Sequence, residues 1–192
     1  MYMHVYPYVY IHTYVVSNLT NKNVVVLSLL SDGGWMNEAF LWANKNGGLC
    51  SEADYPYTSG KTKMIGPCQT SCRKNSKVAP SSFTNVQKNS DRAMMSAVAQ
   101  QPVSVAVDVD EAFMQYKSGI FNSNTCGTAV KHALLVVGYG SSNGQDFYKL
   151  KNSWGTRWGS QGYIFFPRGG GGGGGRREGQ CGMFQYGSFP TL

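Results

Sequence analysis

The chain has 192 residues, of which 42% are hydrophobic and 14% charged, a composition typical of one globular domain or two small ones with a buried core. Lys and Arg outnumber Asp and Glu by 17 to 10, but the basic residues are scattered, so a solvated basic surface is favoured and we expect no nucleic-acid partner. No run approaches roughly 18 consecutive apolar residues, and the N-terminus lacks the basic stretch and cleavage site of a signal peptide, so we expect no membrane association.

The N-terminal part of the chain combines a tyrosine-rich leader with a short helical region. Tyrosines recur at roughly alternate positions in residues 1–30, and we expect this segment to be strand-like or poorly ordered. Apolar residues recur at helical spacing from 35 to 46, and Gly47-Gly48 follows, so the pattern predicts a helix there, with Asp32 near its cap. A long polar loop is predicted for residues 58–82.

The rest of the sequence is dominated by predicted strands. A helix is expected from Ser90, as N-cap, to about Gln100, because Pro102 follows. Residues 103–109 alternate valine with smaller or polar residues, a pattern that predicts a half-buried strand. Further strands are expected at 132–139, 146–151 and 162–166. The seven glycines of 169–175 are typical of a flexible hairpin loop, and helices early with strands late indicate an α+β architecture.

One predicted hairpin carries the residues best suited to chemistry. His132 begins an apolar run and Asn152 ends the next one, after a turn rich in Ser, Asn and Gly, so a hairpin would bring both side chains together. A histidine oriented by an amide can act as a general base, and Trp154 and Trp158 could shield that hydrogen bond from water. Such a base needs a Cys, Ser or Thr to activate. A lone histidine at the head of a strand is more often structural, so the prediction depends on the pairing.

The cysteines favour disulfides over a metal site. Their number, five, leaves at least one without a partner inside this chain. Cys68 and Cys72 are separated by three residues and no histidine lies at zinc-finger spacing, so we expect no metal and no cofactor. Disulfide formation in an oxidising compartment explains these residues better.

A series of short motifs runs in one order through residues 31–192. They are Ser31-Asp32-Gly33-Gly34-Trp35-Met36, Asp54-Tyr55-Pro56-Tyr57, Gln101-Pro102-Val103-Ser104-Val105, Gly119-Ile120-Phe121, Val130-Lys131-His132-Ala133, Val137-Gly138-Tyr139-Gly140, Lys151-Asn152-Ser153-Trp154-Gly155-Thr156-Arg157-Trp158-Gly159, Gly162-Tyr163-Ile164, Cys181-Gly182 and Ser188-Phe189-Pro190. Together they resemble the papain-like cysteine peptidases, the family of papain and the cathepsins. The resemblance implies a cysteine-type endopeptidase that works through an acyl-enzyme on a Cys thiolate.

The resemblance also implies an organisation into domains. The fold class is α+β, with a right-hand domain built on an antiparallel β-barrel over residues 78–192 that includes the glycine-rich loop 169–175. Residues 31–77 would be the remnant of a helical left-hand domain, truncated in this chain. Residues 1–30 carry no family motif and are expected to be a non-homologous leader.

By resemblance, His132 is the general base, Asn152 orients it, and Trp154 and Trp158 shield their hydrogen bond. The residues expected to bind substrate are Gly33, Gly34, Trp35, Met36, Ala106, Val130, Ala133 and Tyr186. We expect no charge beside Tyr186, which favours apolar over basic substrate side chains. An ordinary core role for this tyrosine fits equally well.

The chain departs from the family at the nucleophile. The Cys-Gly-Ser/Ala-Cys-Trp/Tyr motif of the family lies about 130 to 150 residues before the histidine, which from His132 reaches residue 2 or a position before the chain. No such motif occurs in the sequence, and the oxyanion-hole glutamine that precedes it in the family is missing as well. We therefore expect the chain as written to have no peptidase turnover.

The family also suggests how the cysteines pair. Cys126 with Cys181 matches an intact family disulfide, and Cys50 with Cys72 could form a further bridge. Cys68 matches a cysteine whose partner lies in the segment that is missing here. Lys131 stands where an acidic or polar residue is common, and we expect its charge to lower the pKa of His132.

Three interpretations are open at this point. The favoured one is the C-terminal part of a peptidase from an incomplete gene model, which would act on peptide or protein substrates once completed upstream. A second is a pseudoenzyme that binds peptides or inhibitors, cystatin-type inhibitors among them. A third is a purely structural or interaction unit. We expect a monomer, and the family implies a lysosomal, vacuolar or extracellular location.

Overall fold

The computed structural model describes residues 35–50, 54–56, 58, 62, 71–72, 74–75, 79–169 and 176–191, together with the backbone of two short strands. These strands, β1 (Val15–Val16) and β2 (Val26–Leu27), pair antiparallel. The rest of the expected leader, residues 28–34 and Gly170 to Gly175 of the glycine loop lie outside the described residues. The described chain divides into one compact unit of residues 85–189 and another that contains 35–84 and 190–191.

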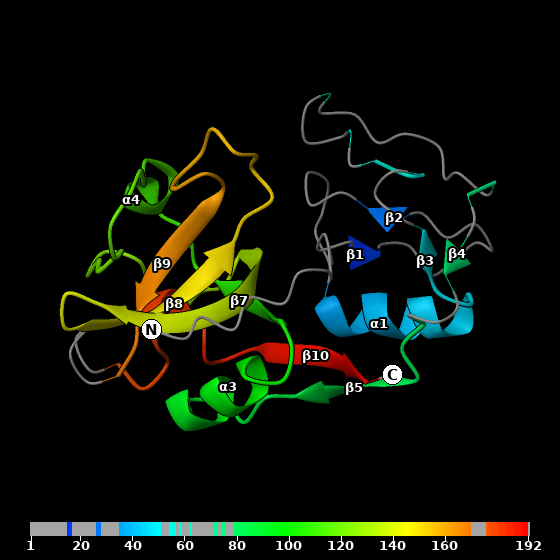
Figure 1. The fold of residues 1–192 in the computed structure, drawn as a ribbon, viewed down its shortest axis with the longest axis horizontal. Coiled ribbons are helices and arrows are strands. Elements are labelled where there is room, and N and C mark those ends of the chain that lie inside the picture. Colours follow the sequence, from blue (N-terminus) through cyan, green and yellow to red (C-terminus); the bar gives the residue numbers. More distant parts are fainter. Residues whose placement is uncertain are drawn as a thin grey trace. The chain divides into compact units, whose positions relative to one another are not determined.

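An antiparallel sheet is the framework of the fold (Figure 1). Its strand order is β5 (Ser82–Asn85), β10 (Gly187–Thr191), β6 (Val103–Val107), β7 (His132–Ser142), β8 (Gln145–Lys151) and β9 (Tyr163–Pro167). The pairs β10–β6, β6–β7, β7–β8 and β8–β9 all run antiparallel. The predicted α+β class, with strands dominating the later part of the chain, is confirmed.

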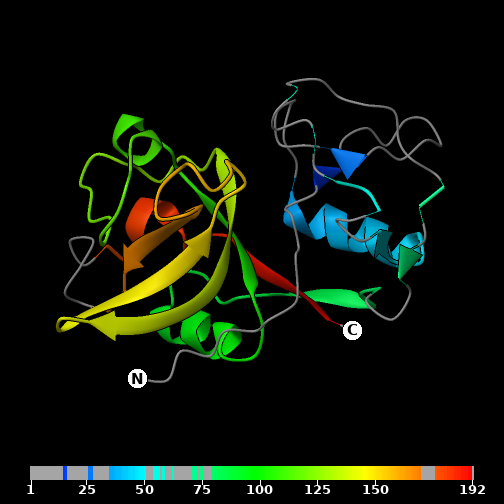
Figure 2. The same ribbon diagram turned by 45° about the horizontal axis from the view of Figure 1, so that its top comes forward.

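Strands β7 and β8 form the hairpin that the sequence predicts. Asn143 and Gly144 make the turn with φ of 50° and 75°, the left-handed backbone that two-residue hairpin turns require and that Asn and Gly tolerate. A register shift between Val136 and Gly138 interrupts the pairing. Figure 2 shows the pair as a long twisted ribbon beside β9.

The alternation in residues 103–109 is not that of a half-buried strand, and this expectation is wrong. All five residues of β6 are buried, Ser104 included at 2% exposed. The reason is that β6 is an interior strand, hydrogen-bonded between β10 and β7, with protein on both of its faces. The alternation of valine with alanine and serine in β6 is therefore an alternation of large and small buried side chains, not of buried and exposed ones.

Helices α1, α3 and α4 accompany the strands in the described ranges. Helix α1 (Met36–Lys45) buries Met36, Phe40 and Ala43, as its periodicity predicts, while the expected cap Asp32 lies outside the described residues. In α3 (Asp91–Val98), the side chain of the predicted N-cap Ser90 accepts a hydrogen bond from the Ala93 amide at 3.1 Å.

Helix α4 (Glu111–Met114) was not predicted from the sequence. Asp110 caps it by accepting a bond from the Phe113 amide at 2.8 Å. In both views α3 and α4 lie on opposite sides of strands β7 to β9.

The smaller elements include two strands and a short 3-10 helix. Strand β4 (Lys74–Asn75) lies in the region predicted as a loop, 58–82, and pairs with β3 (Leu49–Cys50), which precedes that region. The short helix η3 (Gln180–Gly182) precedes β10. None of the helices in the described part of the chain is long and apolar enough to cross a membrane.

The core of the sheet unit is made by large side chains with almost no exposed surface. They include Met94, Phe113, Leu134, Tyr148, Leu150, Ile164, Phe166 and Met183. The Tyr148 hydroxyl is buried with them, and it donates to the Asp91 carboxylate at 2.5 Å, which satisfies its polar atom. Burial and this hydrogen bond raise the pKa of Tyr148, so the phenol stays neutral.

Leu134 tests how much of the stability comes from this core, because it lies two residues after His132 and is 0% exposed. We expect Leu134→Ala to lower the free energy of unfolding by about 2–5 kcal/mol through lost burial and a residual cavity. The matched control is Met114→Ala, since this side chain is 53% exposed, and it should change stability by no more than about 0.5 kcal/mol. Urea denaturation followed by tryptophan fluorescence measures both, and equal losses for the two variants would contradict this account of the core.

Candidate functional site

The hairpin brings His132 and Asn152 together. His132 is the first residue of β7 and pairs with Val107 of β6, while Asn152 follows the last residue of β8. The backbone N–H of Asn152 donates to the Gly162 carbonyl at 2.9 Å, which fixes the backbone just beyond the strand. As a result, His132 Nε2 lies 2.9 Å from Asn152 Oδ1.

The hydrogen bonds of Asn152 determine which ring nitrogen of His132 is basic. Asn152 Oδ1 also accepts the backbone N–H of Ser153 at 2.7 Å. A backbone N–H can only donate, so the shared atom must be the amide oxygen, and Nε2 of His132 must donate to it. The neutral imidazole therefore carries its proton on Nε2 and leaves the Nδ1 lone pair available as a proton acceptor.

Aromatic rings enclose this pair. The Trp154 ring lies 4.9 Å from the His132 ring between centroids, tilted by 32°, and the ring of Phe113 meets the histidine edge-on at 6.4 Å. Trp158 stacks on Phe113 at 5.4 Å and meets Trp154 edge-on at 5.1 Å between ring centroids. It therefore packs against both rings that contact His132. Asn152 is only 5% exposed, whereas Trp154 is 40% exposed and forms the outer wall.

Burial dominates the protonation of His132. It lowers the pKa of the imidazole below 6.5, and the hydrogen bond to Asn152 raises the pKa in part. Because the folded pKa lies below the unfolded value, protonation favours the unfolded chain. The stability that the neutral ring contributes is full above pH 6.5 and is lost as the pH falls through the folded pKa.

Lys131 is not a free charge beside the histidine. Its ammonium forms an ion pair with Asp108 at 2.9 Å, and the carboxylate is 10% exposed. The sequence predicts an effect of Lys131 on the pKa of His132, but its pairing with Asp108 was not expected. A carboxylate directly after an apolar strand was the available signal.

The expected substrate residues lie in different parts of the structure. Ala106 and Ala133 are cross-strand partners in β6 and β7, and both are buried. Trp35 and Met36 belong to the other compact unit, the first 52% and the second 5% exposed. Val130 is half-buried, and Gly33 and Gly34 lie outside the described residues.

The expectation of no charge beside Tyr186 is wrong. The Lys88 ammonium lies 4.6 Å from the centre of the tyrosine ring, a cation–π contact. Lys88 is distant in sequence, so only the tertiary structure shows this charge.

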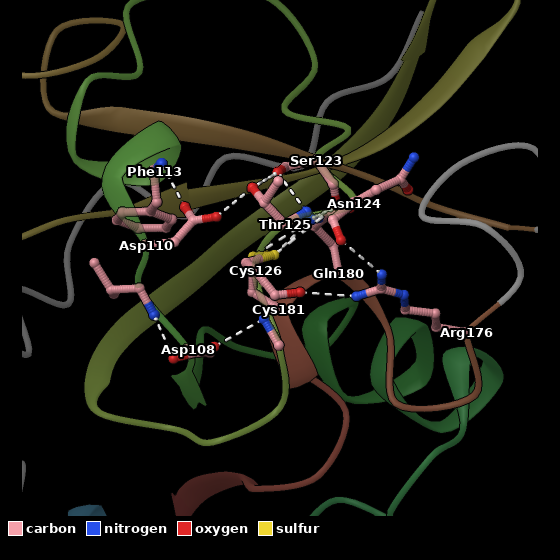
Figure 3. Close-up of a disulfide and its surroundings, with 12 residues drawn as sticks. Asp108, Asp110, Phe113, Ser123, Asn124, Thr125, Cys126, Arg176, Gln180 and Cys181 are labelled. Atoms are coloured by element: carbon pink, nitrogen blue, oxygen red, sulfur yellow. Dashed lines mark hydrogen bonds between the residues drawn. A yellow bond between two sulfur atoms is a disulfide. The ribbon is translucent and has the colours of Figure 1, made fainter.

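Every cysteine of the described residues is in a disulfide. The structure contains Cys126–Cys181 and Cys50–Cys72, and Cys68 lies outside the described residues. Figure 3 shows Cys126–Cys181 in a polar network, in which Arg176 donates to the Cys126 carbonyl at 2.8 Å and Gln180 to the Ser123 carbonyl at 2.9 Å. No cluster of three potential metal ligands occurs in the part of the chain that the structure describes.

Fold and site together define a protein in which a buried histidine is hydrogen-bonded to an asparagine at the end of two strands of an antiparallel sheet. Residues 17–191 match the family described as papain family cysteine protease. The chain belongs to this family. On this match, only residues 1–16 of the expected leader lie outside the family region.

Individual relatives agree with this assignment. The chain is 43% identical over 164 residues to cysteine proteinase COT44 of Brassica napus, covering 83% of this chain and 46% of that protein. It is 40% identical over 160 residues to zingipain-2 of Zingiber officinale, covering 83% of this chain and 68% of the relative. Several other curated relatives are likewise matched over less than half of their length.

Solved structures show the same similarity. The bromelain protease of Ananas comosus in complex with the E64 inhibitor superposes with a TM-score of 0.73 at 39% identity, covering 83% of this chain and 70% of that one. The Carica candamarcensis protease CMS1MS2, in complex with E-64, gives a TM-score of 0.65 at 35% identity over 83% of this chain and 68% of that one.

Removal of the Asn152 amide should change the titration of His132. Because the hydrogen bond to Asn152 raises the pKa of His132, we expect Asn152→Ala to lower this pKa and to release the Nε2 tautomer. Nitrogen chemical shifts of the imidazole, followed by NMR against pH, report both changes. Ser153→Ala is the matched control, since Ser153 acts through its backbone N–H, and it should leave the titration unchanged. Identical titrations in the parent and the Asn152 variant would rule out the orienting role.

Proposed function

We propose that this chain carries the general-base half of a papain-type cysteine endopeptidase site. The observation that carries the proposal is the sharing of Asn152 Oδ1 between the Ser153 N–H and His132 Nε2. That arrangement leaves His132 Nδ1 as the proton acceptor. A base held in one tautomer and shielded by Trp154 is what thiol activation requires.

The chemistry follows from this geometry once a cysteine thiol meets Nδ1. The thiol proton passes to Nδ1, which gives a thiolate and an imidazolium whose Nε2–H still bonds Asn152. The thiolate sulfur attacks the peptide carbonyl carbon, and the imidazolium returns its proton to the leaving amine as the C–N bond breaks. Water then hydrolyses the thioester with the neutral imidazole as base, and the thiol is regenerated.

We further propose that residues 1–192 alone do not turn over peptides. Four of the five cysteines form the disulfides Cys50–Cys72 and Cys126–Cys181. The fifth, Cys68, stands between Pro and Gln and has no family nucleophile motif around it. In a comparable hydrolase, loss of the nucleophile alone costs on the order of 10⁶ in rate.

The test is a fluorogenic peptide assay of residues 1–192, with an apolar residue before the arginine at the cleaved bond. We expect no cleavage of the peptide that is sensitive to a thiol-directed epoxide inhibitor. Fusion of a segment with the Cys-Gly-Ser-Cys-Trp motif of the family should create inhibitor-sensitive cleavage, and His132→Ala in that fusion should abolish it. Inhibitor-sensitive cleavage by the unfused chain would refute the proposed inactivity, and an active His132→Ala fusion would refute the proposed base.

Partners and compartment follow from the same proposal. The completed site would take peptide or protein substrates and bind cystatin-type inhibitors, and the chain would act as a monomer. Two disulfides support an oxidising compartment, such as a lysosome, a vacuole or the cell exterior.

A peptide- or inhibitor-binding pseudoenzyme is the alternative function. It is favoured by the 40% exposure of Trp154 beside His132, since a large exposed aromatic ring at such a site can contact a ligand without catalysis. Calorimetric titration of the chain with a cystatin should then give saturable heat that Trp154→Ala reduces. Absence of heat at several temperatures would exclude this alternative, and Met114→Ala serves as the exposed control.

A further inference from the structure

Asp108 is a buried carboxylate paired with Lys131, the residue that precedes the proposed base. It directly follows β6, and its side chain is bonded at both oxygens. Oδ1 accepts from the Lys131 ammonium at 2.9 Å and from the Val109 amide at 3.0 Å, while Oδ2 accepts the Gly127 amide at 2.8 Å. With 7% of Asp108 exposed, these donors are what make a charged form tolerable.

The backbone around Asp108 connects three parts of the site. Its amide donates to the Cys181 carbonyl at 2.8 Å, and the Lys131 amide donates to the Val107 carbonyl at 2.9 Å. Figure 3 shows Asp108 below the Cys126–Cys181 disulfide, with its carboxylate bonded to backbone amides. Asp108 therefore joins the disulfide, the loop at Gly127 and the residue that precedes His132.

Gly127 fits this role of Asp108. A β-carbon at position 127 would lie 3.0 Å from Asp108 Oδ2, which is closer than a side chain tolerates without movement. Glycine thus permits the close approach of the loop to the carboxylate.

The described side chains in contact with the ring of His132 carry no charge. Those side chains are Asn152, Trp154 and Phe113, and all are neutral. The charged residues on the neighbouring elements are Asp110 and Glu111 at α4, Lys151 in β8, and Arg157 between the tryptophans. Asp110 is bonded to Thr125 and to the Phe113 amide, and Glu111 to Gln115.

We propose that Asp108 is a positioning residue for His132 that balances and holds the ammonium of Lys131. The inference rests on the proposed function, in which the imidazole must become an imidazolium. An unbalanced ammonium on the preceding residue would oppose that protonation, and the carboxylate cancels it. Asp108 keeps its own charge because, although burial raises its pKa, the bonds from Lys131 and Gly127 outweigh burial and lower it.

The test is an NMR titration of His132 in the full chain, which needs no turnover. The signal is assigned by its loss in His132→Gln. We expect the pKa of His132 to fall in Asp108→Asn, because Lys131 is left unbalanced, and to rise in Lys131→Met, because Asp108 is left unbalanced. In the double variant both charges are gone, so the pKa should return to the parent value.

The double variant separates electrostatic balance from a purely structural role. If Asp108 only supported the fold, the change caused by Asp108→Asn would persist when Lys131 is also replaced, and that outcome would overturn the proposal. If Asp108→Asn does not fold, Lys131→Met alone decides, since the Lys131 side chain is 63% exposed and its loss should leave the fold intact. An unchanged pKa in that variant would also overturn it. An inactive fusion protein in the peptide assay would count against the proposed function and leave these titrations unaffected.

Discussion

The site depends on one amide oxygen. Asn152 Oδ1 accepts hydrogen bonds from the Ser153 backbone N–H at 2.7 Å and from His132 Nε2 at 2.9 Å. The backbone N–H is a donor in every case, whereas the ring nitrogen can be a donor or an acceptor. Because a backbone amide cannot accept, the orientation of the side chain follows, and so does the tautomer of the histidine. The identity of the basic nitrogen is thus a consequence of main-chain geometry at Ser153.

That geometry is fixed by the pairing of β7 with both neighbouring strands. β7 is paired on both sides, with β6 and with β8, so the position of His132 is set by two ladders. Phe113 connects this framework to the aromatic wall, since it is fully buried and contacts both His132 and Trp158. Local burial then lowers the pKa of His132, which keeps the ring neutral and basic near neutral pH.

The disulfide Cys126–Cys181 and the Asp108–Lys131 ion pair stabilise the segment that leads into His132. The carboxylate of Asp108 is bonded to the loop that carries Cys126, and its amide to the carbonyl of Cys181. The ion pair and the disulfide are therefore linked to each other through Asp108. A lysine beside a proposed base is compatible with this site because its charge is already compensated.

Sequence alone determined the α+β class, the helices expected at 35–46 and from Ser90 to about Gln100, and the pair His132 and Asn152, because these depend on local periodicity, capping and hairpin spacing. The family followed from the resemblance of ordered motifs, and the family match confirms it. The Cys-Gly-Ser/Ala-Cys-Trp/Tyr motif does not occur within residues 1–192. Only the tertiary structure decided the full burial of β6, the Lys88 charge at Tyr186 and the partner of Lys131. These features depend on contacts between residues far apart in the chain or on both faces of a strand, and a local pattern contains no information about what covers it.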